Sequence, residues 1–549
     1  MEDMKTERLL RIINNRGKNM KEKILNEGKN LKDWFNKDRI ALIIFTIIFG
    51  FMAHIIFITG NIATQDSLWL GFSYSKPGSW EISLGRWGIL LVERLNNFVM
   101  IPSVVTTLDI ILIAISVVFI CDIFNFKNRL SRFITISVII LSPAIYITFF
   151  YIHTSLAYCF AFLFSTISIW FLYKFKYKKI GFIVSALSIV ATLALYQSYI
   201  GVMVGICIMY NVISLLRDEK EIKEVFLFIG KAILSVLIGA IVYYSLTSII
   251  FKIFNLNLST YNGADEISIL SIIKNLKQTI PSCYTKFFDY FISDNLFYNT
   301  NYRRELLWGL LGIISIVVFI IRLSKLKGSS SKDKCVKIIL SIIFTCSIPI
   351  GLNIINVIVG HDCIYALTSV QMILFVPFIL AIVEELHTIN VLYYVDILVI
   401  IMIIITFFVA GSTSYEVMKF TYNQSIMTTE RIISRIESLD EYEKGMPVVF
   451  AGIIDDDNFE RTSVLYDFSL GFCANNTVFH GDYVGQKGTW NRFLEIFFGT
   501  HYPVVSDEWY MIIINNEKFK EMGVFPAQDS VQILEGAVVV KLKENPATP

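Results

Sequence analysis

Apolar residues gather into eleven long segments between residues 40 and 411 of this 549-residue chain. A bilayer core about 30 Å thick needs roughly 20 apolar residues for each helical crossing. The fold class that this pattern predicts is a polytopic α-helical membrane protein with about eleven transmembrane helices. The predicted spans are residues 40–59, 101–124, 130–150, 153–173, 180–198, 199–216, 225–254, 305–323, 335–358, 365–384 and 393–411.

Residues 180–216 form one apolar stretch that is too long for a single crossing. The polar interruption Tyr196-Gln197-Ser198-Tyr199, followed by Gly201, favours two helices joined by a tight turn.

Lys and Arg in the short loops predict on which side of the membrane each loop lies, because short loops rich in Lys and Arg are usually cytoplasmic. Residues 1–39 carry eleven basic residues, whereas the short loops near residues 151, 200 and 360 have no Lys or Arg. Eleven crossings then place the N-terminus in the cytoplasm and the C-terminus outside an integral cell membrane. The last inner loop, 385–392, is the exception, since it has no basic residue. The other inner loops contain Lys127, Arg129, Arg132, Lys174, Lys176, Lys178, Lys179, Arg217, Lys220, Lys223, Arg322, Lys325, Lys327, Lys332, Lys334 and Lys337.

Three regions follow from this topology. Residues 1–39 are expected to be a basic, amphipathic leader on the cytoplasmic face, and residues 40–411 the membrane domain. Residues 412–549 hold 11 basic and 20 acidic residues and are expected to form an acidic domain outside the cell. This charge argues against a nucleic-acid partner. The low proline content and the abundance of Ile, Asn and Lys are typical of a bacterial protein.

The last region has the pattern of a small α/β domain. We expect a short polar join at Gly411-Ser-Thr-Ser, then a helix over 416–444. Residues 448–454 and 509–514 have the pattern of buried strands, and residues 531–542 that of a hairpin turning at Glu535-Gly536. Because Trp490 and Trp509-Tyr510 are aromatic, we expect them to stack on an acceptor glycan.

Two predicted outer loops, 60–100 and 255–304, are much longer than the topology requires, and loops of this length are usually functional. In the first, Asp66 lies just beyond the first span, where partial desolvation favours a general base. Trp69 offers a face for a sugar ring, and Arg86 offers a donor fork that matches phosphate. The alternative is structural, because Trp and Arg are common at membrane interfaces.

Further polar candidates lie elsewhere. Arg303 and Arg304 end the second outer loop, whose residues 267–291 predict an amphipathic helix on the outer leaflet. Phosphate binding and a solvated helix start are the two explanations for this outer Arg pair. His361 faces outward and is expected to line a cavity as a hydrogen-bonding residue. Asp109 lies inside the second span, where an ionisable group is a functional candidate, unless nearby threonines satisfy it.

The sequence gives no reason to expect a metal or another cofactor. Asp455-Asp456-Asp457 is a consecutive run, which suits a strand-end turn better than metal coordination. The eight cysteines show no paired spacing, so neither a disulfide framework nor a CxxC metal site is supported.

Several short motifs occur together in a fixed order. They are Asp66 after the first span, Gly85-Arg86-Trp87, Tyr196-Gln197, Met427-Thr-Thr-Glu-Arg431, and the closing segment from Gly523 to Leu542. In this order they resemble the type II glucosyltransferases of the phage serotype-conversion kind, which glucosylate O-antigen. That family has the membrane architecture of C-type glycosyltransferases. The resemblance covers residues 40 to about 545.

The resemblance implies an enzyme that moves a hexose, glucose being expected, from a polyprenyl-phosphate sugar to a cell-surface polysaccharide or related glycan. It makes Asp66 the single base of an inverting reaction on the outer face. Many members have two adjacent acids at this place, where this chain has Gln65-Asp66 and Glu81 as the other nearby carboxylate. The residues expected to bind the donor phosphate or the substrate are Trp69, Glu81, Arg86, Trp87, Asp109, Tyr196, Gln197, Arg303, Arg304 and His361.

The implied partners are the lipid-linked donor, the acceptor glycan, the bilayer, a glycosyltransferase that makes the donor and a small flippase. Two other functions are compatible with the residues. One is a transporter or flippase of lipid-linked sugars, and the other is a structural role in which the tail binds glycan.

Overall fold

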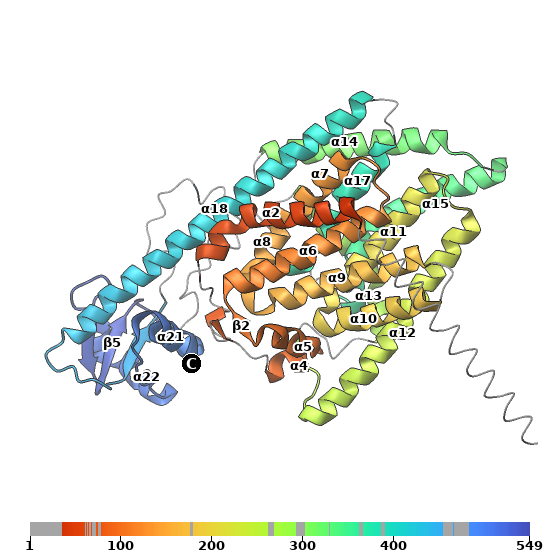
Figure 1. Cartoon of the computed structure of the whole chain (residues 1–549). Coiled ribbons are helices and arrows are strands. Elements are labelled where there is room, and N and C mark those ends of the chain that lie inside the picture. Colours follow the sequence, from red (N-terminus) through yellow and green to blue (C-terminus); the bar gives the residue numbers. More distant parts are fainter. Residues whose placement is uncertain are drawn as a thin grey trace, which may run out of the picture.

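The computed structural model describes residues 36–60, 62, 64, 67–68, 73–74, 78–175, 179–261, 268–292, 302–328, 330–361, 366–385, 390–453, 465 and 483–548 (Figure 1). The predicted leader lies outside these residues, except for its last four. Asp455–Asp457 also lie outside them.

The described part of the chain confirms a polytopic helical membrane protein, with nine helices that are long and apolar enough to cross a membrane and up to ten if a bent pair counts as one. The nine are α2 (Lys37–Gly60), α6 (Pro102–Ile123), α9 (Ile152–Lys174), η2 with α11 (Gln197–Tyr199 and Ile200–Leu216), α12 (Ile222–Phe254), α14 (Tyr302–Lys325), α15 (Ser331–Leu352), η4 with α17 (Ala366–Leu374 and Phe375–Glu384) and α18 (Asn390–Glu437).

The two remaining predicted spans are also helical. The segment 130–150 is the bent pair, in which α7 (Arg129–Ile140) and α8 (Pro143–Phe150) meet at 44°. Pro143 causes this break, because it has no N–H to donate and its ring disfavours a helical residue before it. The segment 180–198 is α10 (Lys179–Leu195), an apolar helix of 17 residues. The predicted interruption of 180–216 is confirmed, since η2 separates α10 from α11.

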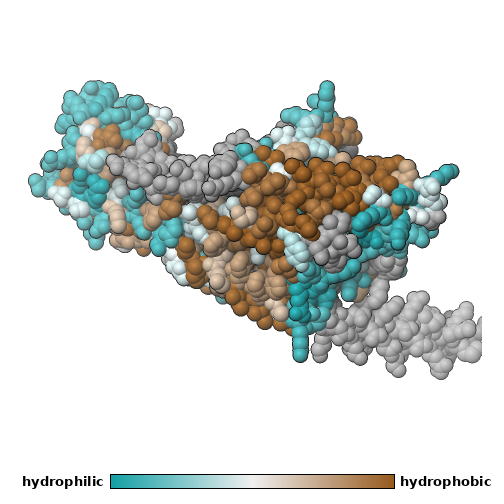
Figure 2. Space-filling view, turned by 90° about the horizontal axis from the view of Figure 1, so that it is seen from above, coloured by the Kyte–Doolittle hydropathy of each residue, from teal (hydrophilic) through white to brown (hydrophobic). Residues whose placement is uncertain are grey.

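The helices form a buried centre and a lipid-facing periphery. In the most apolar 18-residue window of Gln197–Leu216, 89% of the residues are buried. In the corresponding window of Arg304–Lys325, 22% are buried. Many exposed side chains in the middle of α12 and α14 are apolar, among them Ile233, Leu237, Ile241, Ile313, Ile316 and Ile320. Figure 2 shows a broad apolar surface over the bundle and a polar surface over the C-terminal domain. This distribution matches a protein whose outer helices contact hydrocarbon.

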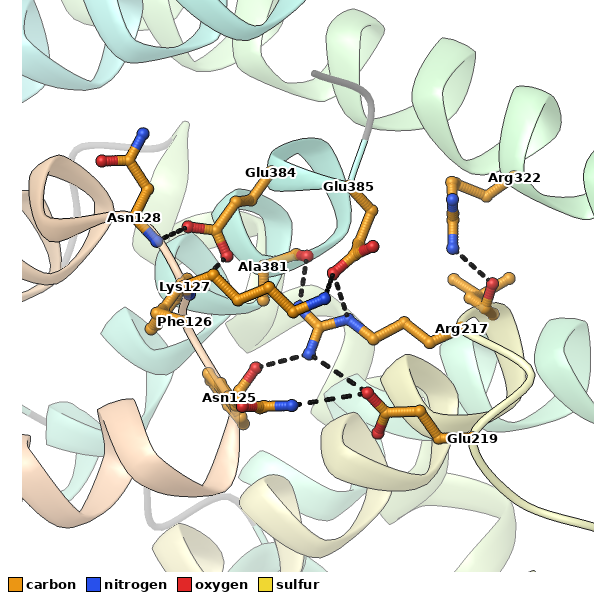
Figure 3. A network of polar contacts seen from close by, with 12 residues as sticks. Asn125, Phe126, Lys127, Asn128, Arg217, Glu219, Arg322, Ala381, Glu384 and Glu385 are labelled. Atoms are coloured by element: carbon orange, nitrogen blue, oxygen red, sulfur yellow. Dashed lines mark hydrogen bonds and ion pairs between the residues drawn. The ribbon is translucent and has the colours of Figure 1, made fainter. Parts of the chain in front are cut away.

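Helix ends that the sequence assigns to the inner side meet in one polar network (Figure 3). Arg217, at the end of α11, donates to the carbonyl oxygens of Phe124 (2.9 Å) and Ala381 (3.0 Å), and its Nε lies 3.2 Å from Glu385. Glu384 accepts the backbone N–H groups of Lys127 and Asn128 at 3.2 and 2.7 Å. The last inner loop, 385–392, lacks basic residues, and its first residue, Glu385, forms ion pairs with Lys127 and Arg217 from two other inner loops.

The second long loop contains the predicted amphipathic helix as α13 (Ile269–Phe291). Its exposed residues include Leu270 and Ile273. The side that packs into the bundle is made by Thr279, Cys283, Phe287 and Tyr290, all buried. A short helix, α16 (Ile354–Val359), lies against it.

The expected polar join between the membrane domain and the tail is wrong. The helix α18 runs unbroken for 48 residues, so Gly411-Ser-Thr-Ser is helical and carries the chain directly to the C-terminal domain (Figure 1). Gly411 allows close packing, because a Cβ there would clash with the ring of Tyr146 on α8. In the domain, Arg435 of α18 donates to the carbonyl oxygens of Ala527 (2.7 Å) and Pro526 (2.9 Å).

The C-terminal domain has a three-stranded sheet in the order β3-β5-β4. The strand β3 (Val448–Ala451) pairs in parallel with β5 (Ala537–Lys541), which pairs antiparallel with β4 (Val531–Leu534). The predicted hairpin is confirmed, with positive φ at Glu535 and Gly536 as its tight turn requires. The helices are α21 (Tyr483–Phe498), α22 (Asp507–Asn515) and α23 (Glu517–Glu521).

The strand expected over 509–514 is wrong, and the expected stacking on a glycan is wrong for Trp490 and Tyr510, whereas Trp509 is partly exposed. Residues 509–514 belong to the helix α22, because Ser506 caps it by accepting the Trp509 N–H and two acids occupy the first turn. Trp490 and Tyr510 are fully buried, with Trp490 stacked on Phe450 at 4.6 Å between ring centroids. These two aromatic side chains form core and are not available to a glycan.

We expect Arg217→Met to lower the free energy of unfolding by about 3 kcal/mol, because it leaves two carbonyl oxygens without their donor and removes the buried partner of Glu385, which keeps only the exposed Lys127. Thermal unfolding of the purified protein in detergent measures this loss. The matched control is Arg129→Met, whose ion pair with Asp38 is exposed. It should change stability by less than about 1 kcal/mol. Equal unfolding temperatures for the two variants would contradict a stabilising role for the network.

Candidate active site

The motif Gly85-Arg86-Trp87 forms a tight turn between two short helices, α4 (Ser79–Ser83) and α5 (Gly88–Glu93). Gly85 has φ of 77°, a conformation that glycine adopts without strain. Its carbonyl oxygen accepts a hydrogen bond from the Tyr243 hydroxyl at 3.1 Å. A side chain at residue 85 would clash with that hydroxyl, so the turn requires glycine for two reasons.

Gln197 holds the turn from the break between α10 and α11. Its Nε2 donates to the Leu84 carbonyl oxygen at 2.8 Å and to the Tyr243 hydroxyl at 3.0 Å. Both bonds orient the amide so that its oxygen faces Arg86, whose Nε lies 3.4 Å away. The Arg86 guanidinium also lies over the Tyr196 ring, 4.8 Å from its centroid. The guanidinium is therefore positioned by a hydrogen bond and a cation–π contact together.

Trp87 attaches the turn to α12, because its Nε1 donates to the Thr247 hydroxyl at 3.0 Å. The two long outer loops also meet here, where the Ser259 N–H donates to the Ser83 carbonyl oxygen at 3.0 Å. Four residues that the sequence singled out, Arg86, Trp87, Tyr196 and Gln197, thus come together from two distant segments, and α12 supplies a third through Tyr243 and Thr247.

Asp109 is fully buried in α6, and neither of its carboxylate oxygens has a hydrogen-bond partner among the described residues. Ser155 and Cys159 of α9 lie beside it. The nearby threonines do not satisfy it: Thr106 also has no partner in the described structure, and Thr107 donates to Ser103. A buried ionisable group of this kind inside a span is a functional candidate.

Asp66 and Trp69 lie outside the described residues, but their immediate neighbours are firmly held. Thr64 and Ser67 exchange side-chain to backbone hydrogen bonds at 2.9 and 3.3 Å, and the Leu68 N–H donates to the Thr64 carbonyl oxygen. The Thr64 hydroxyl lies 3.4 Å from the carbonyl oxygen of Phe150, the last residue of α8. Thr64, Ser67 and Leu68, the described residues next to Asp66 in the sequence, are all buried.

Arg304 is 4% exposed, so the solvated helix start does not describe it. Its Nη2 donates to the Ile292 carbonyl oxygen at 3.0 Å, which ties the start of α14 to the end of α13. The side chain of Arg303 lies outside the described part. His361 is half-buried and follows Gly360, whose φ of 88° ends α16.

Glu81 and Glu93 form a pair of buried carboxyl groups on either side of the turn. Glu81 accepts the Gly78 N–H at 2.8 Å. Burial, and to a lesser degree the charge of Glu81, raises the pKa of Glu93 to about 9. The sequence reasoning missed Glu93. The available signal was an acid that closes the apolar run Gly88-Ile-Leu-Leu-Val-Glu93.

The described residues contain no group of His, Cys, Asp or Glu that could hold a metal ion. What they do contain is an oriented guanidinium in a turn that two buried carboxyl groups, Glu81 and Glu93, flank in the sequence. This combination suits a substrate with an anionic group and many hydroxyls.

The family model of Glucosyl transferase GtrII matches residues 72–380, which is more than half of the chain. The chain belongs to the GtrII family. It is therefore a membrane glucosyltransferase, and the family that the motifs predicted is confirmed. The matched part of this GtrII protein includes the Arg86 turn, Glu81, Glu93, Asp109, Gln197, Arg304 and His361. It begins after Asp66 and Trp69 and ends before the tail. No curated protein and no solved structure matches the chain.

We expect Arg86→Lys to raise the KM for a lipid-phosphate donor about 10-fold, because lysine keeps the charge but loses the fork and the stacking on Tyr196. Initial rates with a polyprenyl-phosphate sugar in detergent measure this change. Arg94→Lys is the matched control, since Arg94 lies in the same loop and is exposed. An unchanged KM in Arg86→Lys would count against a phosphate contact.

Proposed function

We propose that this GtrII protein transfers a hexose, expected to be glucose, from a polyprenyl-phosphate sugar to a cell-surface polysaccharide or related glycan. Transfer takes place on the outer face of the membrane, with a C-type glycosyltransferase architecture. The observation that carries the proposal is the Arg86 turn, because it offers an oriented phosphate-binding group at the end of an apolar bundle. A lipid-linked phosphate donor needs both a phosphate contact and an apolar surface for its lipid chain.

The placement of the turn supports an outer site. Gln197, at the start of the η2–α11 span, holds Arg86, whereas Arg217 at its far end belongs to the polar network of basic loops. The span is 20 residues long, enough to cross a bilayer core. The turn and the basic loops therefore lie at opposite ends of one crossing, and basic loops favour the cytoplasm.

In the proposed reaction Asp66 removes the proton from an acceptor hydroxyl as that oxygen attacks C1 of the sugar. The bond between C1 and the phosphate oxygen breaks, and polyprenyl phosphate leaves with the electron pair. Direct displacement inverts the configuration at C1. Arg86 stabilises the charge of the leaving phosphate, and Arg303 and Arg304 are the other proposed phosphate contacts. A transporter of lipid-linked sugars is the alternative, and it requires no base.

We expect Asp66→Asn to lower kcat by about 10²–10⁴-fold while the protein still inserts and folds, because the amide lacks the basic lone pair. The measurement is product formation from a radiolabelled polyprenyl-phosphate glucose, with comparison of surface glycan from cells that carry each form. The matched control is Asp333→Asn, at the opposite end of the helical bundle, in the first turn of α15. Near-normal product from Asp66→Asn would remove Asp66 as the base.

The tail is proposed to aid acceptor binding without taking part in the chemistry. Because α18 enters the domain as a continuous helix, the chain should be cut after Glu437, which keeps the whole span and its packing on Tyr146. We expect the truncated protein to retain donor hydrolysis but to lose most transfer to polysaccharide. Separate assays of the two reactions measure this. Full transfer by the truncated protein would leave the tail a stabilising role alone.

A further inference from the structure

Two carboxyl groups flank the Arg86 turn in the sequence. Glu81 precedes it in α4 and Glu93 follows it as the last residue of α5. The first of them is tied to the turn through the backbone, because the Arg86 N–H donates to the Glu81 carbonyl oxygen at 3.0 Å. Both side chains are buried, and the charge of Glu81 acts on Glu93. The Arg86 turn is therefore flanked by two buried carboxyl groups that act on each other.

Glu93 is the unusual member of this pair. Its side chain is 1% exposed, and neither carboxyl oxygen has a hydrogen-bond partner among the described residues. Its backbone is fixed, since the Phe98 N–H donates to its carbonyl oxygen at 2.9 Å. A buried carboxyl group without a partner lowers stability, and such a group in a native protein calls for an explanation, of which a functional role is one.

The chemistry of the pair selects the ligand. With a raised pKa Glu93 keeps its proton at neutral pH, so it can donate through its O–H and accept through its carbonyl oxygen. A sugar hydroxyl has the same two capacities. A phosphate would be repelled by the charge of Glu81, and Arg86 already offers a better contact for it. The complementary ligand is therefore the sugar.

We propose that Glu93, positioned beside Glu81, binds a hydroxyl group of the transferred sugar and determines which hexose the enzyme accepts. This inference rests on the proposed function. A site built to bind a hydroxyl discriminates strongly against an analogue that lacks it, because its own polar group then stays unpaired. Glu93 is in this sense a specificity-determining residue for the transfer reaction.

The test compares wild type, Glu93→Gln and Glu93→Leu in lipid nanodiscs, with Glu221→Gln as an exposed control. The donors are polyprenyl-phosphate glucose and its analogues that each lack one hydroxyl. We expect Glu93→Leu to lower kcat/KM for the glucose donor roughly 10-fold. With the analogue that lacks the hydroxyl bound by Glu93, Glu93→Leu and wild type should have the same kcat/KM, because neither protein can make that contact. Glu93→Gln keeps a donor and an acceptor and should stay within about 3-fold of wild type.

Thermal unfolding separates this role from a structural one. Removing an unpaired buried carboxyl should leave the unfolding temperature of Glu93→Leu unchanged or raise it. A lower unfolding temperature with unchanged kcat/KM would overturn the inference, as would an equal loss with every analogue. If wild type and Glu93→Leu consume the glucose donor equally well, the inference about Glu93 is refuted and the proposed function stands. A wild-type protein that consumes no donor refutes the proposed function together with the inference.

Discussion

Inside a membrane every backbone N–H and C=O group must find a partner within the protein, and this constraint shapes each place where the helices of this chain break. At the bend between α7 and α8, His54 Nε2 lies 3.1 Å from the Ile140 carbonyl oxygen. Because that oxygen can only accept, Nε2 donates, and Nδ1 then accepts from the Tyr415 hydroxyl 2.6 Å away. At the end of α15, Gln371 donates to the Leu352 carbonyl oxygen at 2.9 Å. Buried polar side chains thus replace the missing helical bonds.

The candidate site uses the same device. Gln197 lies at a break between two helices, yet its amide satisfies the Leu84 carbonyl oxygen in a loop more than 100 residues away. The oxygen of the same amide then faces Arg86. The Gln197 amide, which satisfies a backbone group as the membrane requires, therefore also orients Arg86, which is proposed to bind phosphate. Damage to Gln197 would affect both, which is why Arg86 and Glu93 are better probes of function.

The continuous α18 gives the C-terminal domain a fixed attachment. Tyr415 contacts His54 within the bundle, and Arg435, which lies further along the same helix, binds the C-terminal domain. A helix of 48 residues transmits position in a way that a polar join would not. Its Gly411-Ser-Thr-Ser segment has the composition of a linker but packs against Tyr146, where a larger residue than glycine would not fit.

The sequence by itself determined the class of the protein, its helical segments, the break at residues 196–199, the hairpin at Glu535-Gly536 and the family. These follow from local pattern: apolar length, turn residues and short motifs act over a few neighbours. The helical fate of residues 509–514 was missed because an apolar run suits a strand or a buried helix equally, and the capping Ser506 decided it. The grouping of Arg86 with Gln197 and Tyr243, the burial of Trp490 and the unpartnered carboxyl of Glu93 were decided by the tertiary structure alone. They depend on contacts between segments far apart in the chain, which no local pattern records.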